Sequence, residues 1–159
     1  MITIKEIYEP SEKSKICDAI LRGLPAWFEV DTAIIDYVSR VKSMEFYSAY
    51  DEEDKDKRSI GFVAIKNHNK YTSEIVVMGT HRNFHNKGVG KTLIANLEQN
   101  LREKGVEFIT VKTLSETVES KSYKRTRAFY HDRGFRPLEV FDHIWGDENP
   151  CVFMVKKIK

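Results

Sequence analysis

Two glycines near the middle of the chain, Gly88 and Gly90, separate an apolar stretch from an amphipathic one. Residues 71–79 (YTSEIVVMG) are rich in β-branched and apolar side chains, which predicts a strand, and residues 80–87 follow as a polar loop. Over residues 88–104 apolar side chains recur every fourth residue, as on the buried face of a helix: Val89, Leu93, Leu97 and Leu101. The chain is therefore predicted to contain a strand–loop–helix unit whose helix begins at a glycine pair.

A glycine pair at the start of a helix is suited to binding phosphate. The first backbone N–H groups of a helix have no partner within the helix, and the helix dipole makes this end positive. Glycine lets a ligand approach the backbone closely. Lys87 and Lys91 flank the pair and add positive charge. We therefore expect a phosphate or pyrophosphate group at this loop.

Two nucleotide-binding motifs fail here at a required position. Gly90-Lys91-Thr92 agrees with the end of a Walker A loop, but the first glycine of that motif would fall on His85. The dinucleotide motif GxGxxG requires glycine where Leu93 stands. A nucleotide phosphate-binding protein that uses Gly90-Lys91-Thr92 is therefore the weakest of the alternatives.

A third motif, [Q/R]xxGx[G/A], agrees better with residues 85–90 (HNKGVG). On these residues the chain resembles the GNAT acetyltransferase superfamily, which carries a pyrophosphate loop between its fourth strand and third helix. Residues 129–135 (FYHDRGF) are similar to the FYxxxGF segment of the same family. The chain departs from the family at the first loop position, where His85 replaces the usual Gln or Arg. We expect this histidine to weaken binding or to make it depend on pH.

The remaining predicted elements agree with the resemblance. Strands are expected over 2–8, 46–50, 59–66, 106–112, 134–141 and 151–157, and helices between Pro10 and Gly23, from Asp31 onward and over 121–132. Asp31 is the expected N-cap of the second helix, whose buried side is expected to carry Ile34, Ile35, Val38 and Val41. The order is β-α-α-β-β-β-α-β-α-β-β. We predict one acetyltransferase domain over residues 1–159 with a GNAT-like α/β fold, a mixed, mostly antiparallel twisted sheet of about seven strands flanked by about four helices.

Composition excludes several other classes of protein. The 26 Lys and Arg residues nearly balance 24 Asp and Glu, a net charge of +2, whereas a nucleic-acid binder usually has a basic excess. No apolar run is long enough for a membrane helix, and the first residues lack a signal-peptide core. The two cysteines, Cys17 and Cys151, have no disulfide or metal spacing. We expect a cytoplasmic protein that binds no nucleic acid, membrane or metal.

The resemblance implies that an acetyl group passes from acetyl-CoA to an amine. Such a transfer needs an acid for the departing CoA thiolate and a base for the attacking amine. Tyr130 holds the position of the family's tyrosine in the FYxxxGF segment, and a phenol with an ordinary pKa near 10 is protonated at neutral pH. Tyr130 is therefore the candidate acid, and an aromatic that only packs in the core is the alternative.

Glu74 is the candidate base, because some members of the family carry a catalytic glutamate on this strand. In an alternating strand Glu74 shares a face with Val76 and Met78, and apolar neighbours would raise its pKa, which suits a base. The alternatives are an exposed carboxylate, a carboxylate paired with a lysine or arginine, and a chain of waters in place of a single base.

The resemblance also assigns contacts with acetyl-CoA and with the acceptor. The pyrophosphate is expected on the loop residues His85, Asn86, Lys87, Gly88, Val89, Gly90 and Lys91. The pantetheine arm is expected along the backbone of Val77 and Gly79, and Tyr123 stands where the family often has Asn. Aromatic walls for the acceptor are expected from Trp27, Phe28 and Trp145, with core packing as the alternative.

These assignments lead to an N-acetyltransferase that acts by direct transfer in a ternary complex. The acceptor would be an amine-bearing small molecule or peptide, and the resemblance also allows a homodimer. An acyl-enzyme at Cys151 is the weaker mechanism, because no nucleophile motif surrounds that cysteine. The alternative from another class is a binding module that holds an acyl-CoA as a sensor without turnover.

Overall fold

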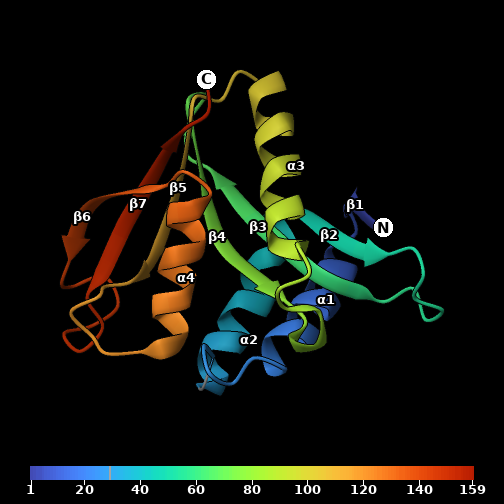
Figure 1. Cartoon of the computed structure of the whole chain (residues 1–159), viewed down its shortest axis with the longest axis horizontal. Helices are drawn as coiled ribbons and strands as arrows, with labels where there is room; N and C mark the ends of the chain where they lie inside the picture. The colour runs from blue at the N-terminus through green and yellow to red at the C-terminus, as the bar shows by residue number, and fades with distance from the viewer. Residues whose placement is uncertain (29) are drawn as a thin grey trace. The chain divides into compact units, whose positions relative to one another are not determined.

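The computed structural model describes residues 1–28 and 30–159 (Figure 1). The strands are Ile2–Glu6 (β1), Glu45–Asp51 (β2), Ser59–Asn67 (β3), Thr72–Thr80 (β4), Phe108–Leu114 (β5), Arg136–Phe141 (β6) and Cys151–Lys157 (β7). The α-helices are Pro10–Arg22 (α1), Asp31–Arg40 (α2), Val89–Glu103 (α3) and Lys121–Asp132 (α4), with short 3-10 turns at Val41–Ser43 (η1) and Arg82–Phe84 (η2).

Across these described residues the strands pair in the order β1-β2-β3-β4-β5-β7-β6, a seven-stranded sheet. The β4–β5 pair is parallel, and the β1–β2, β2–β3, β5–β7 and β6–β7 pairs are antiparallel. The predicted mixed, mostly antiparallel α/β fold with four helices is therefore confirmed. The predicted helix over 121–132 and the predicted strand over 151–157 agree with the structure residue for residue.

Two local predictions differ from the structure. Asp31 is the first helical residue of α2 and not its N-cap, which is Val30. Ile35 was expected on the buried side of α2 but is 54% exposed, whereas Ile34 on the same helix is buried. A helix turns by about 100° per residue, so the adjacent side chains of Ile34 and Ile35 point in different directions and only one of them faces the core.

The chain divides into two compact units, and the first comprises Met1–Lys66 with Val76–Asn100. In this unit α1 and α2 lie side by side (Figure 1). Their apolar side chains pack with residues of β2, β3 and β4 into one core, which includes Ile20, Leu21, Ile34, Phe46, Phe62, Ala64 and Val77. The rings of Phe46 and Phe62 stack at 5.1 Å between centroids. This core holds α1 against the end of β4, where the predicted pantetheine residues lie.

The second unit comprises Asn67–Ile75 with Leu101–Lys159. The first half of β4 pairs in parallel with β5, with Glu74 opposite Thr110. The next ladder pairs β5 with β7 and places Lys112 opposite Phe153. Helix α4 contacts β5, and the Arg127 guanidinium donates a 2.7 Å hydrogen bond to the Leu114 carbonyl at the end of that strand. The unit thereby holds Glu74 on a strand and Tyr130 on a helix.

A membrane-spanning helix is not found in the part of the chain that the structure describes, since none of its helices is both long and apolar enough.

Candidate active site

The glycine loop adopts the backbone conformation that glycine permits. Gly88 has φ +82°, in the left-handed region, and a Cβ built there would meet nothing within 4 Å. Asn86 is also left-handed, with φ +61°. The Gly88 carbonyl accepts hydrogen bonds from the Thr92 N–H at 3.0 Å and the Thr92 hydroxyl at 2.8 Å, which starts α3. The N–H groups of residues 89–91 precede this first helical bond, so they have no acceptor within the helix and are available to an anion.

His85 is directed toward the end of β4. Its Nε2–H donates to the Thr80 carbonyl at 2.8 Å, and its ring meets Trp27 edge-on at 5.8 Å between centroids. Lys87 lies with its ammonium group 5.2 Å from the centre of the Phe84 ring. The histidine is thus committed to contacts within the protein, and the backbone of the loop is left to contact an anion.

The end of β4 is packed tightly against α1. Val77 is buried in the core of the first unit. A Cβ on Gly79 would lie 3.0 Å from Ile20 Cγ2 and 3.3 Å from Leu24 Cδ1. Glycine at position 79 therefore lets α1 approach the strand, which is a structural reason for this residue. The predicted pairing of the Val77 and Gly79 backbone with pantetheine stays a prediction.

Tyr130 lies in the last turn of α4 and is only 5% exposed. Its ring contacts Phe129 and Phe135, with centroids 5.3 Å and 5.4 Å away. Burial raises the pKa of the Tyr130 phenol above its ordinary value. In the residues that the structure describes, the hydroxyl has no hydrogen-bond partner. Tyr130 can therefore donate a proton to a ligand without first breaking a bond within the protein.

Helix α4 also carries Tyr123, one turn from its start. The Ser120 side chain caps the helix by accepting a 3.3 Å hydrogen bond from the Tyr123 N–H. This cap explains why the helix begins at residue 121, since a serine N-cap satisfies one of the unpaired N–H groups. The predicted contact between Tyr123 and the cofactor stays a prediction.

Glu74 is a buried carboxylate with a partner on each oxygen. Its Oε1 lies 2.7 Å from His68 Nε2, and its Oε2 lies 3.0 Å from Lys112 Nζ. The Lys112 ammonium also lies 5.0 Å from the centre of the Phe153 ring. Of the alternatives considered for Glu74, the structure shows the paired carboxylate. A pair of this kind either fixes the orientation of a base or stabilises the sheet.

Neither His68 nor Lys112 was predicted from the sequence. The alternation of apolar and polar residues finds each strand, but it does not give the register between strands. Residues on one strand that are two apart share a face, so the pairing of Glu74 with Thr110 brings Lys112 to the face of Glu74. The signal for this cluster is the parallel register, which becomes visible only in the structure.

Cys151 is fully buried at the start of β7. Burial raises the pKa of its thiol to about 11, with Lys112 lowering it and Glu74 raising it to smaller extents. Because the nucleophile is the thiolate, this thiol is a poor attacking group at neutral pH. Among the described residues no three His, Cys, Asp or Glu side chains come together as metal ligands.

The three predicted pocket aromatics lie in different surroundings. Trp27 and Phe28 are partly buried against the core of the first unit. The Phe28 ring meets Tyr37 edge-on at 6.0 Å. Trp145 belongs to the second unit, in the connection between β6 and β7, and is 36% exposed. Core packing thus accounts for part of the surface of Trp27 and Phe28, and their contact with an acceptor stays a prediction.

Comparison with known proteins adds a family and a fold. Residues 13–135 match the model of the acetyltransferase (GNAT) family. A comparison with curated protein sequences finds no match. A GNAT-family structure from Desulfovibrio desulfuricans is similar over all of both chains, with 12% identity and a TM-score of 0.82. An aminoglycoside 6′-N-acetyltransferase complexed with coenzyme A is 16% identical over 99% of this chain and 97% of its own, with a TM-score of 0.75.

A GNAT-family acetyltransferase from Elizabethkingia anophelis with acetyl-CoA bound has 18% identity and a TM-score of 0.70. The alignment covers 98% of this chain and 97% of that one. At identities this low, the similarity of the three structures concerns the fold.

Proposed function

Because the chain belongs to the acetyltransferase (GNAT) family, we propose that it transfers an acetyl group from acetyl-CoA to a primary amine by direct transfer in a ternary complex. In this reaction the amine nitrogen forms a bond to the acetyl carbon, the carbon–sulfur bond of the thioester breaks, and the CoA thiolate takes up a proton. Two protein groups are required, one to remove a proton from the amine and one to protonate the thiolate. Residues 1–159 would act as one acetyltransferase domain.

The observation that carries this proposal is the glycine loop at the start of α3. Gly88 is left-handed and faces open space, and the backbone N–H groups of residues 89–91 have no acceptor within the helix. This arrangement is suited to the pyrophosphate of acetyl-CoA, and Lys87 and Lys91 add positive charge beside it. Two solved structures with the same fold contain coenzyme A or acetyl-CoA.

Tyr130 is the proposed acid. Its burial keeps the phenol protonated at neutral pH, and its hydroxyl has no partner among the described residues. The proton passes from the Tyr130 hydroxyl to the CoA sulfur as the thioester breaks. The tyrosinate that remains recovers its proton from solvent before the next turnover.

Glu74 is the proposed base, directly or through a water that it orients. A carboxylate held on both oxygens by His68 and Lys112 has a fixed orientation, which favours proton abstraction from a positioned amine. The acceptor itself would be an amine-bearing small molecule or peptide. Trp27, Phe28 and Trp145 are proposed as aromatic walls for its apolar or cationic groups.

The test combines titration calorimetry with acetyl-CoA and an assay of thiol release over a panel of primary amines. Gly88→Ala is expected to weaken acetyl-CoA binding by about tenfold or more, since a Cβ at this φ strains the loop and intrudes on the anion. Gly105→Ala is the matched control, because Gly105 has φ +85° at the other end of α3 and also faces open space. The control is expected to lose similar stability and to keep its acetyl-CoA affinity.

Two results would contradict the proposal in different ways. Acetyl-CoA binding without thiol release over the whole amine panel would favour a non-catalytic acyl-CoA sensor. Equal loss of affinity in Gly88→Ala and Gly105→Ala would mean that the loop acts only through stability, and would remove the structural basis of the cofactor site.

A further inference from the structure

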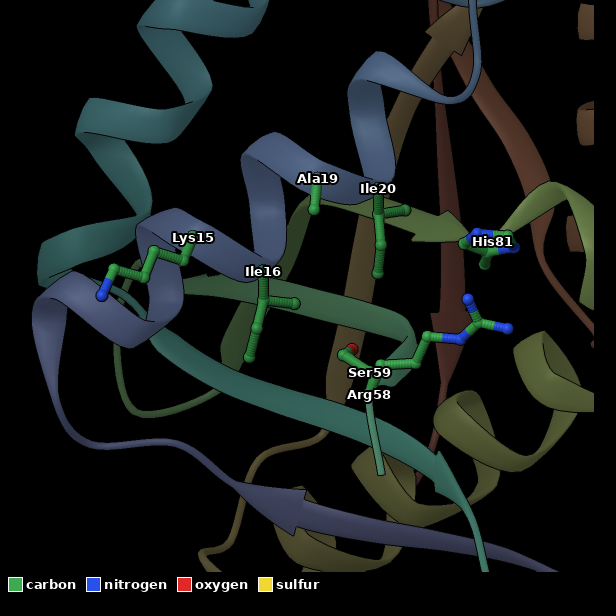
Figure 2. A pocket seen from close by; sticks show the side chains of 7 residues that line it. All are labelled: Lys15, Ile16, Ala19, Ile20, Arg58, Ser59 and His81. Carbon is green, nitrogen blue, oxygen red and sulfur yellow. The ribbon is translucent and has the colours of Figure 1, made fainter. Parts of the chain in front are cut away.

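We propose that the first unit has a second ligand site, a pocket of about 300 Å³ beside α1 that binds a small carboxylate through Arg58 and His81 (Figure 2). The pocket is lined by α1, by the start of β3 and by the residue that follows β4. Its binding groups are side chains, in contrast to the backbone loop at the start of α3. The site does not rest on the proposed acetyl transfer, because it is defined by residues outside that loop.

One wall of the pocket is apolar. Ile16, Ala19 and Ile20 share one face of α1, because residues three and four apart lie together on a helix. Figure 2 shows the side chains of Ile16 and Ile20 directed from α1 toward the strands below. This wall can cover a short hydrocarbon group of a ligand but offers it no hydrogen bond.

The opposite side presents a donor from His81. The Nδ1 atom of His81 accepts a 3.2 Å hydrogen bond from the Asn83 N–H, so the proton of the neutral ring lies on Nε2. In the residues that the structure describes, this Nε2–H has no acceptor. A donor on a partly buried ring is therefore left for an oxygen of a ligand.

Arg58 supplies the positive charge. Its Nε lies 3.4 Å from Asp54 Oδ2, and in the described part of the chain its two terminal nitrogens have no hydrogen-bond or ion-pair partner. Figure 2 shows the guanidinium group extending toward His81. The charge of Arg58 also lowers the pKa of His81, which agrees with the closeness of the two groups. A planar carboxylate can accept from a guanidinium in bidentate fashion and from the imidazole.

The rest of the lining does not compete for this role. The Ser59 hydroxyl donates to the Gly61 carbonyl at 3.1 Å and lies 2.6 Å from the Ser48 hydroxyl. The ammonium group of Lys15 points away from Ile16 and Ile20 in Figure 2, so its stem lines the edge. The seven lining residues include no carboxylate, and Asp54 beside them is held in its ion pair with Arg58.

Binding is expected to depend on pH through His81. Burial, chiefly, together with the charges of Arg58, Arg82 and His85, lowers the pKa of His81, so the ring is neutral at pH 7. A bound carboxylate favours the protonated ring. The other charged groups beside the site are Asp54, which is paired with Arg58, and Lys15 of α1, whose stem lines the edge. Affinity should therefore rise as the pH falls through the range in which the ring of the complex becomes protonated.

The experiment is an NMR titration of the whole chain, without acetyl-CoA, with hexanoate as the probe. The methyl signals of Ile16, Ala19 and Ile20 and the ring signals of His81 are expected to shift with a Kd on the order of 1 mM. Hexanol and hexylammonium have the same tail without the negative charge, and they should bind at least tenfold more weakly. Equal binding of hexanol would overturn the proposal.

Variants locate the binding groups. Arg58→Met and His81→Asp should weaken hexanoate binding at least tenfold, and Asp keeps the acceptor that caps the Asn83 N–H. Asp54→Asn releases Arg58 from its ion pair and should keep or increase the affinity. Lys55→Met is the matched control, because it removes a positive charge from the same connection between β2 and β3. Its affinity for hexanoate is expected to stay unchanged. An unchanged affinity in Arg58→Met, with a wild-type melting temperature, would overturn the proposal.

A second probe, 6-aminohexanoate, separates two sources of the carboxylate. Thiol release from acetyl-CoA that depends on Arg58 would assign the carboxylate to an acceptor. Binding without thiol release would assign it to a separate ligand. Failure of 6-aminohexanoate and hexanoate to bind at all would refute the pocket and leave the proposed acetyl transfer unaffected.

Discussion

The ring of Tyr130 contacts Phe129 and Phe135, and its hydroxyl has no protein partner among the described residues, while burial favours the neutral phenol. Replacement by phenylalanine keeps the ring contacts and removes only the proton donor. Tyr130→Phe should lower kcat by about 100-fold or more, within the usual range for acid–base catalysis. Its acetyl-CoA affinity and melting temperature should stay at wild-type values. A variant that turns over normally would exclude Tyr130 as the acid.

The raised pKa of Tyr130 also predicts a pH profile. An acid works only while it is protonated, and the ordinary phenol pKa of about 10 is already above the assay range. Because burial moves the pKa of Tyr130 upward, kcat should not fall between about pH 7 and pH 9 through loss of this proton. The measurement is kcat against pH at saturating substrates. An alkaline fall in kcat within this range that disappears in Tyr130→Phe would show that Tyr130 loses its proton there, and would contradict the raised pKa.

Cys151 is expected to be unreactive in the native protein. With a pKa of about 11, the thiolate fraction at pH 8 is about one part in a thousand. Burial likewise raises the pKa of Cys17 to about 12, so neither thiol should react quickly with a disulfide reagent before unfolding. Cys151→Ala should retain thiol release from acetyl-CoA, as direct transfer requires. Loss of turnover in a folded Cys151→Ala protein would instead support an acyl-enzyme.

At the scale of elements, the ion pair between β4 and β5 decides how Glu74 is tested. Glu74→Gln leaves the Lys112 ammonium without its anion, and breaking a buried pair costs about 3–5 kcal/mol, less here because Lys112 is partly exposed. The double variant Glu74→Gln/Lys112→Met removes both charges and should recover much of that stability.

The same pair of variants separates a base from a structural carboxylate. If Glu74 is the base, kcat stays low in the double variant even though stability returns. If Glu74 only anchors the sheet, kcat returns together with the melting temperature.

The close approach of α1 to β4 depends on Gly79. A Cβ there would press on three core side chains, Ile20 at 3.0 Å, Leu24 at 3.3 Å and Leu21 at 3.4 Å. Gly79→Ala should lower the free energy of unfolding by about 1–3 kcal/mol, the usual cost of overpacking. Gly23→Ala is the control, since its nearest contact is 3.4 Å and its φ is −83°. Denaturant unfolding of both variants measures the difference. Equal free energies of unfolding for Gly79→Ala and Gly23→Ala would show that α1 can shift away from β4 without cost.

Over the whole molecule, sequence periodicity predicted the elements well. The stripe of Val89, Leu93, Leu97 and Leu101 is buried, and α3 follows the glycine pair as expected. The cofactor loop could be predicted because its residues are contiguous, so one short motif contains the whole feature. The bounds of the helix over 121–132 were predicted, and the structure shows Ser120 as its N-cap.

Features that join distant segments could not be predicted. The partners of Glu74 depend on strand register, and the Arg58–His81 pocket depends on three segments that are separate in the sequence. His85 occupies the first position of the loop motif, which the sequence shows. Its contacts with Thr80 and Trp27 are seen only in the structure. Such contacts follow from tertiary packing, which periodicity does not encode.

The left-handed backbone at Gly88 has a consequence for how this protein can mutate. Every missense change of a single base in a glycine codon introduces a residue with a Cβ. Each such substitution at position 88 therefore strains the backbone, whose φ is +82°. Two of the accessible residues, Asp and Glu, also bring negative charge to a site proposed for a pyrophosphate. Saturation mutagenesis with selection for activity should therefore leave position 88 almost without substitutes, while position 105 accepts Asn, which tolerates the left-handed region.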